Sequence, residues 1–206
     1  MNDNPTPSPA ALDALCELVN IGVGRAAAAL AELTGRTVAI AVPTVEVVRF
    51  DHPSQVADLQ QGITLRVSQA FTGGLSGQAL LILNSQGAQR LAELLLGKPP
   101  GDGSFDANDQ AALLELGNII IGGVIGRLVD HLGVSVNYDL PMLQLRGVSD
   151  VVDLISDLVG PGQTHLLLMR ASLSIAAEHI SGYLILLAGG PLEELFQKIE
   201  SSLNPC

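Results

Sequence analysis

Two copies of a short polar pattern contain the residues of this chain best suited to chemistry. Glu17 is followed three residues later by Asn20, and Glu115 is followed in the same way by Asn118, 98 residues further along the chain. Two carboxylates could act as acid and base on a substrate if they lay within about 10 Å of each other. Asparagine is a mediocre helix former, so its recurrence at the same place suggests that the amide is used.

Asp13 extends the first copy of the pattern. Asp13, Glu17 and Asn20 are separated by four and three residues, so on a helix all three lie on one face. The corresponding position of the second copy is Ala111. A single Glu-x-x-Asn would be an ordinary surface stripe of an amphipathic helix. The recurrence of both residues at one offset favours a functional role.

The segments around these residues also recur. Residues 14–43 align without gaps on residues 112–141, and a second echo follows each copy at a slightly longer offset. An internal repeat of this kind predicts two related units, residues 10–98 and 105–203. We expect them to form a single domain over the whole chain.

Each unit is predicted to contain a helix, three strands and a closing helix. The predicted helices cover residues 9–34, 86–96, 108–132 and 191–203. The predicted strands cover residues 37–50, 63–72, 75–83, 134–146, 165–175 and 180–188. We therefore expect an α/β (α+β) fold with pseudo-twofold related halves, in which six mainly antiparallel strands are covered by helices. Residues 1–9 are rich in proline and are expected to form a disordered tail.

Glycines and prolines within these elements predict how the elements meet. Five glycines interrupt the two long helices, and we expect them to permit close helix packing. They are Gly22, Gly24, Gly122, Gly123 and Gly126. Each long helix should end at a glycine, Gly35 or Gly133, in a left-handed conformation. Pro43 and Pro141 fall in strand-like runs, so each should lie on an edge strand, at a strand end or at a bulge.

Composition narrows the classes of protein to which this chain could belong. Its 206 residues include 10 Lys and Arg against 21 Asp and Glu, a formal net charge of −11. Nucleic acids and anionic membrane surfaces attract basic proteins, so we expect neither as a partner. The chain has no continuous apolar run of about 20 residues and no signal-peptide pattern. We therefore expect a cytoplasmic protein.

The complete pattern, (Asp or Ser)-x-x-x-Glu-x-x-Asn-x22-Pro, resembles the signature of the CheC/CheX/FliY phosphatases of bacterial and archaeal chemotaxis. The first copy matches at every position, with Asp13, Glu17, Asn20 and Pro43. The second copy matches at all but its first position, with Ala111, Glu115, Asn118 and Pro141. Two copies, without an evident further motor domain, resemble CheC more than single-site CheX or the longer FliY.

The resemblance implies a phosphatase for the aspartyl phosphate of a CheY-type receiver domain in chemotaxis or two-component signalling. It implies that Glu17 and Glu115 pair with a receiver Lys, and that Asn20 and Asn118 position the attacking water. The receiver would supply Mg²⁺, so the resemblance implies no cofactor or metal in this chain. The two cysteines and the scattered histidines show no metal-ligand spacing.

The resemblance also assigns supporting roles. Asp13 would make a peripheral contact or cap, and Pro43 and Pro141 would hold a strand beside each helix. Ala111 leaves open whether the second site is as active as the first. CheD, a deamidase that CheC proteins bind, is a possible further partner.

Two alternatives remain open from the sequence. The stripes could dock a phosphorylated receiver or CheD without hydrolysis, as a non-catalytic interaction module. Glu17 and Glu115 could instead form the carboxylate pair of a hydrolase, although this hypothesis gives the two asparagines no role.

Overall fold

The computed structural model describes residues 7–40, 44–49, 64–101, 105–146, 165–175, 178–188 and 192–203. Its helices are α1 (Pro9–Thr34), α2 (Ser85–Leu96), α3 (Ala107–Leu132) and α5 (Leu192–Leu203). Its strands are β1 (Val38–Ile40), β2 (Thr44–Arg49), β3 (Thr64–Gly73), β4 (Gly77–Asn84), β5 (Val136–Tyr138), β6 (Met142–Arg146), β7 (His165–Ile175) and β8 (Glu178–Ala188).

All eight described strands belong to one sheet, and every pair in it is antiparallel. The order is β1-β7-β8-β4-β3-β5, with β2 also paired to β7 and β6 also paired to β3. The β3–β4 hairpin and the β7–β8 hairpin meet at the β4–β8 pair in the middle of the sheet. Consequently β1 and β2 lie at one edge, and β5 and β6 lie at the other.

The predicted fold class, helices on a mainly antiparallel sheet, is confirmed, but eight strands are present where six were expected. Each long extended run contains two of the described strands. In the second run these are residues 136–138 and 142–146, and the three residues between them are not in a strand. Pro141 stands directly before β6 and has no N–H to donate to a ladder. Its predicted place at a strand end is therefore confirmed, whereas Pro43 lies outside the described residues.

The two long helices have matching bounds. Each has 26 residues, and α3 begins and ends 98 residues after α1. Gly35 and Gly133 follow them with φ of 63° and 62°, so the predicted left-handed ends are confirmed. The derivation of the halves from one duplicated unit, residues 10–98 and 105–203, stays a prediction.

Ser8 and Pro9 begin α1, although they were expected to lie in a disordered tail. The Ser8 hydroxyl accepts a hydrogen bond from the Ala11 N–H at 3.2 Å, and Pro9 is the first helical residue. Serine as N-cap and proline in the first turn both favour a helix start. Residues 1–6 of the expected tail lie outside the described residues.

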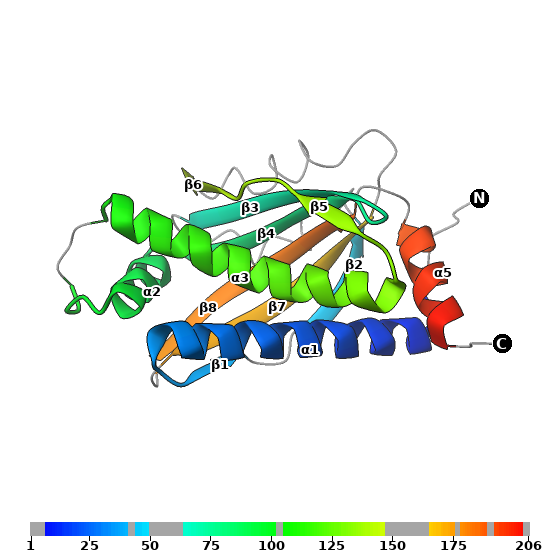
Figure 1. Ribbon diagram of the computed structural model, residues 1–206, viewed down its shortest axis with the longest axis horizontal. Coiled ribbons are helices and arrows are strands. Elements are labelled where there is room, and N and C mark those ends of the chain that lie inside the picture. The colour runs from blue at the N-terminus through cyan, green and yellow to red at the C-terminus, as the bar shows by residue number, and fades with distance from the viewer. Residues whose placement is uncertain are drawn as a thin grey trace.

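Helices α1 and α3 lie side by side against one face of the sheet and run in opposite directions (Figure 1). Helix α2 lies near the start of α3, and α5 lies at the other end of the helix pair. Both long helices have the length and composition of a membrane span, a property that the core helices of soluble proteins share. In this fold their apolar faces pack against each other and against the sheet.

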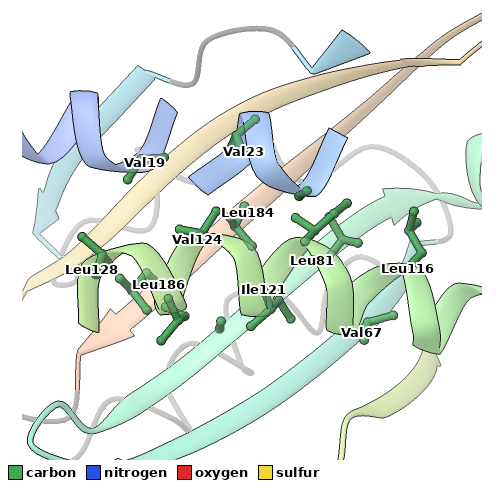
Figure 2. Close-up of a cluster of buried hydrophobic side chains, with 14 of the residues drawn as sticks. Val19, Val23, Val67, Leu81, Leu116, Ile121, Val124, Leu128, Leu184 and Leu186 are labelled. Atoms are coloured by element: carbon green, nitrogen blue, oxygen red, sulfur yellow. The ribbon is translucent and has the colours of Figure 1, made fainter. Parts of the chain in front are cut away.

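Aliphatic side chains fill the space between the helix pair and the sheet (Figure 2). Val19 and Val23 of α1 face Val124 and Leu128 of α3, and Leu184 of β8 lies beneath them. All five are buried. Burying each such side chain contributes about 1.5–3 kcal/mol, so this layer fixes how the two helices lie on the sheet.

Glycine lets the two helices touch at one place. A Cβ on Gly22 would lie 2.7 Å from the Gly123 carbonyl oxygen, and a Cβ on Gly123 would lie 2.9 Å from that of Gly22. The expected close packing is confirmed for these two residues. It is wrong for Gly24, Gly122 and Gly126, because a Cβ there would meet nothing within 4 Å.

Candidate functional site

The predicted polar stripe of α1 lies away from the core. Asp13 and Glu17 are exposed, and Asn20 is half-buried. The buried residues of α1 include Leu15 and Val19, which lie on the side that packs against the sheet and α3. The helix period therefore leaves both acids to solvent and brings the Asn20 amide to the boundary between solvent and protein.

The stripe of α3 is similar and more open. Ala111, Glu115 and Asn118 are all exposed. Leu113 and Leu116 of the same helix are buried against the sheet. Because α1 contacts β1 and β2 while α3 contacts β3 and β6, the two stripes lie toward opposite edges of the sheet.

The antiparallel helix pair separates the two glutamates. The helices meet at Gly22 and Gly123 and run in opposite directions. Glu17 comes before Gly22 and Glu115 before Gly123 in the chain, so the two glutamates lie on opposite sides of this contact. With a rise of 1.5 Å per residue, the two positions are about 20 Å apart along the helix axes. A shared carboxylate chemistry needs about 10 Å or less. The arrangement therefore argues against the carboxylate-pair alternative.

Gln69 of β3 holds the side chain of Asn118. Its Nε2 donates to Asn118 Oδ1 at 3.2 Å and to the backbone oxygen of Asp139 at 3.0 Å. The Asp139 N–H in turn donates to the Ala70 oxygen at 3.0 Å. The buried Gln69 amide thus joins Asn118 of α3, strand β3 and the segment between β5 and β6.

Gly117 allows this arrangement by letting α3 lie close to β3. A Cβ at Gly117 would come within 2.5 Å of Val67 Cγ1. Gly117 directly precedes Asn118, so any larger residue would push this turn of the helix away from Gln69. A glycine in mid-helix costs about 1 kcal/mol relative to alanine, and here the close approach explains its presence.

The segment between β5 and β6 forms a rim beside the second stripe. Pro141 is half-buried, while Leu140 is 88% exposed and Met142 is 56% exposed. Burial first, and the negative charge of Asp130 second, raise the pKa of the Tyr138 phenol on this rim. The phenol therefore keeps its proton and stays uncharged at neutral pH.

The first stripe has a different environment. Asn20 Oδ1 is buried and has no hydrogen-bond partner among the described residues. Pro43, the last residue of the first copy of the pattern, lies outside the described part of the structure. Both stripes therefore lie on their helices as predicted by the helix period. Among the described residues, a hydrogen bond to the stripe asparagine is seen for Asn118 and not for the Asn20 oxygen.

Charged residues around the start of α3 position the second stripe. Asp106 and Asp109 form a capping box, and Lys98 donates to Asp109 Oδ1 at 2.8 Å and to Asp106 Oδ2 at 3.2 Å. The hydrogen bond to Asp109 is the main reason why the pKa of Lys98 is raised. The backbone N–H of Asp109, followed by Lys98, lowers the pKa of Asp106. These contacts hold the first turn of α3 to the end of α2.

Within the described residues, no group of three His, Cys, Asp or Glu side chains could hold a metal ion. The expectation that this chain contains no metal or cofactor stays a prediction.

Comparison with known proteins connects this geometry to a family. A model of the CheC-like family matches residues 11–47, the segment that contains the first copy of the pattern. The chain is 30% identical over 144 residues to a Bacillus subtilis protein named CheY-P phosphatase CheC, an alignment covering 65% of this chain and 66% of that protein. It is 27% identical over 143 residues to the Bacillus subtilis flagellar motor switch phosphatase FliY, covering 67% of this chain and 36% of that protein.

The fold agrees with these sequence matches. A crystal structure of Thermotoga maritima FliY superposes with a TM-score of 0.78 and 21% identity, covering 95% of this chain and 98% of that one. The sequence matches and the shared fold together support the CheC/CheX/FliY family for this chain. Its alignments span just under two thirds of the CheC relative and about a third of the FliY relative.

Two residues that support the family pattern in this chain, Gln69 and Gly117, were not among the predicted site residues. A signal for Gln69 exists in the sequence. Leu65, Val67, Gln69 and Phe71 stand at every second position of the strand, so all four lie on its buried face. A polar residue on a buried face needs a partner. Which partner it finds depends on α3, which no local pattern reveals.

Proposed function

We propose that this chain is a phosphatase that hydrolyses the aspartyl phosphate of a CheY-type receiver domain in chemotaxis. The observation that carries the proposal is the pair of Glu-x-x-Asn stripes on α1 and α3 of a CheC/CheX/FliY-type fold, each with its glutamate exposed to solvent. The name of the Bacillus subtilis relative, CheY-P phosphatase CheC, supports the substrate.

In the proposed mechanism, each glutamate binds the receiver and each asparagine completes its active site. Glu17 and Glu115 are exposed, so either can form an ion pair with a receiver Lys as the helix docks. Asn20 and Asn118 lie one turn further along and would place a water in line with the phosphorus atom. Phosphoryl transfer needs mainly positioning and charge stabilisation, so an amide can suffice without a strong base.

The remaining components would come from the partner. The receiver would bring its phosphoryl group and the Mg²⁺ that neutralises it, while Asp13, Pro43 and Pro141 would support the docking helices. The reaction would take place in the cytoplasm, where receiver domains are found. A CheD-type protein stays a predicted additional partner.

The asparagines provide the direct test. Asn20→Ala and Asn118→Ala should each remove part of the phosphatase rate, and the double variant should remove nearly all of it, about 100-fold or more. The measurement is phosphate release from phosphorylated Bacillus subtilis CheY with catalytic amounts of this protein. Gly126→Ala is a suitable control, since a Cβ there meets nothing within 4 Å and the residue lies outside both stripes.

The same assay separates an enzyme from a docking module. An enzyme speeds the decay of receiver phosphate over many turnovers, whereas a non-catalytic module protects it in a one-to-one complex. A double variant that keeps the full rate would contradict the assignment of Asn20 and Asn118.

A further inference from the structure

We infer that Gln69 is a positioning residue that sets the orientation of the Asn118 amide and makes the second site the better organised of the two. This inference rests on the proposed phosphatase function and concerns how one of its sites is held ready. A chain of hydrogen bonds from the Asp139 carbonyl through Gln69 to Asn118 fixes the orientation of both side-chain amides.

The chain starts at the backbone oxygen of Asp139. A carbonyl oxygen can only accept a hydrogen bond, so the end of the Gln69 amide that faces it at 3.0 Å must be the nitrogen. The orientation of the Gln69 side chain is therefore fixed by the backbone.

The same nitrogen then fixes the orientation of Asn118. Gln69 Nε2 has two N–H groups, and the second donates to Asn118 Oδ1 at 3.2 Å. A rotated Asn118 amide would set two donors against each other, so its oxygen stays toward Gln69. Asn118 Nδ2, which has no partner among the described residues, is left to bind a water or a phosphoryl oxygen.

The burial of Gln69 points to the same role. Its side chain is 3% exposed, and its Oε1 has no hydrogen-bond partner among the described residues. A buried acceptor without a partner is unfavourable for folding. An apolar residue would suit this position of β3 better, so stability alone does not explain the glutamine.

At the first site, a different residue takes the strand position that corresponds to Gln69. Register gives the correspondence: Tyr138 pairs with Phe71 and Met142 with Ser68, while Ile40 pairs with Leu173 and Thr44 with Arg170. The position on β7 that corresponds to Gln69 on β3 is therefore Ala171. Alanine cannot donate a side-chain hydrogen bond.

The α1 helix also differs at the position before its asparagine. Val19 takes the place of Gly117, so the helix cannot approach its strand in the same way. The Asn20 Oδ1 atom correspondingly has no partner in the described part of the chain. The first site has the complete sequence pattern, but its Asn20 oxygen has no hydrogen bond within the described residues. The second site has Ala111 in the pattern, but its Asn118 oxygen is hydrogen-bonded to Gln69.

The test compares one substitution in two single-site enzymes. Asn20→Ala leaves only the second site, and Asn118→Ala leaves only the first. Adding Gln69→Leu to the Asn20→Ala enzyme should lower kcat on phosphorylated Bacillus subtilis CheY about fivefold, the usual worth of one hydrogen bond, with KM unchanged. Adding it to the Asn118→Ala enzyme should change neither value. Gln78→Leu on the neighbouring strand is a matched control in both.

Three results would overturn the inference. An equal loss of kcat in both single-site enzymes would mean that Gln69→Leu damages the sheet rather than one site, and a thermal melt would show the same. No loss in the Asn20→Ala enzyme would mean that Gln69 does not act through Asn118. A rise in KM alone would assign Gln69 to receiver binding.

A measurement without substrate separates this inference from the proposed function. Gln69→Leu should lower the NMR order parameter of the Asn118 side-chain amide and leave that of Asn20 unchanged. If the wild-type protein releases no phosphate, the proposed function fails whatever this measurement shows. If the order parameter of Asn118 does not fall, the inference about Gln69 fails even in an active phosphatase.

Discussion

A side-chain amide exchanges its donor and acceptor by a half-turn about one bond, so its chemistry depends on what surrounds it. In the second site, Gln69 and the Asp139 carbonyl select one orientation for Asn118. In the first, the Asn20 oxygen has no such partner among the described residues. At the residue scale, the two copies of Glu-x-x-Asn therefore share a pattern and differ in what holds it.

The glutamates can be tested by charge reversal. In the Asn20→Ala enzyme, Glu115→Lys should raise KM for phosphorylated Bacillus subtilis CheY about tenfold or more, because two lysines would then meet at the docking surface. The value of kcat at saturation should change less. Glu32→Lys makes the same change of charge at an exposed position of α1 away from the stripe and should have little effect. A KM that is unaffected by Glu115→Lys would contradict the proposed ion pair.

At the scale of elements, the two long helices combine contacts of different kinds. Gly22 and Gly123 let their backbones meet, while Gly24 and Gly122 face open space. Caps at Ser8 and Asp106 begin the helices, and left-handed glycines end them. Each stripe therefore lies on a helix whose two ends are fixed by caps and whose contact with the other long helix is fixed by glycine.

Gly22 and Gly24 make a matched pair for the helix contact. Gly22→Ala should destabilise the protein by about 1–3 kcal/mol, since its Cβ would overlap the backbone of α3. Gly24→Ala should stabilise it by about 0.5–1 kcal/mol, since the new methyl group meets nothing and alanine favours the helix. Chemical denaturation of both variants provides the measurement. Equal effects would contradict the proposed crossing point.

The start of α3 should respond to pH in a defined way. The pKa of Asp106 is lowered in the fold, so its contribution to stability is present above the ordinary carboxyl range and is lost as pH falls through the lowered value. The pKa of Lys98 is raised, so its contribution is present below the ordinary lysine range and is lost as pH rises through the raised value. Asp106→Asn should reduce Tm at neutral pH and reduce its fall in acid. Melting curves across pH would show an unchanged acid fall if Asp106 played no part.

The whole molecule interleaves its two halves. Strands β1 and β2 of the first half pair with β7 of the second, and β5 and β6 of the second half pair with β3 of the first. The β4–β8 pair joins the hairpins at the centre of the sheet. Each of the two long helices thus rests on a sheet edge that contains strands from both halves.

This interleaving predicts that neither half folds alone. Fragments 1–103 and 104–206 should each lack a cooperative thermal transition, because each would lose the partners of its edge strands and of its central strand. Mixing the fragments should restore a transition and a complex of the size of the whole protein. Circular dichroism and gel filtration provide the measurements. A single fragment that melts cooperatively would show that the repeat unit is self-sufficient.

Much of the local structure could be predicted from the sequence. Helix periodicity and the glycines that end the helices gave bounds within one residue of those of α1 and α3, and extended runs rich in aliphatic residues located the strands. The common face of Glu17 and Asn20 follows from the same periodicity. The structure describes eight strands where six were expected, and the expected run at residues 134–146 continued through residues 139–141, which form no strand.

Only the tertiary structure shows which residues of the two repeats contact each other and which are kept apart. Gln69 and Asn118 are 49 residues apart in the chain and meet only because β3 packs beneath α3. The separation of Glu17 from Glu115 follows from the antiparallel packing of two helices at Gly22 and Gly123. Local patterns record which side of an element faces the core. The residue that a buried side chain contacts depends on the register and packing of segments distant in the chain. In this protein that packing brings Gln69 to Asn118.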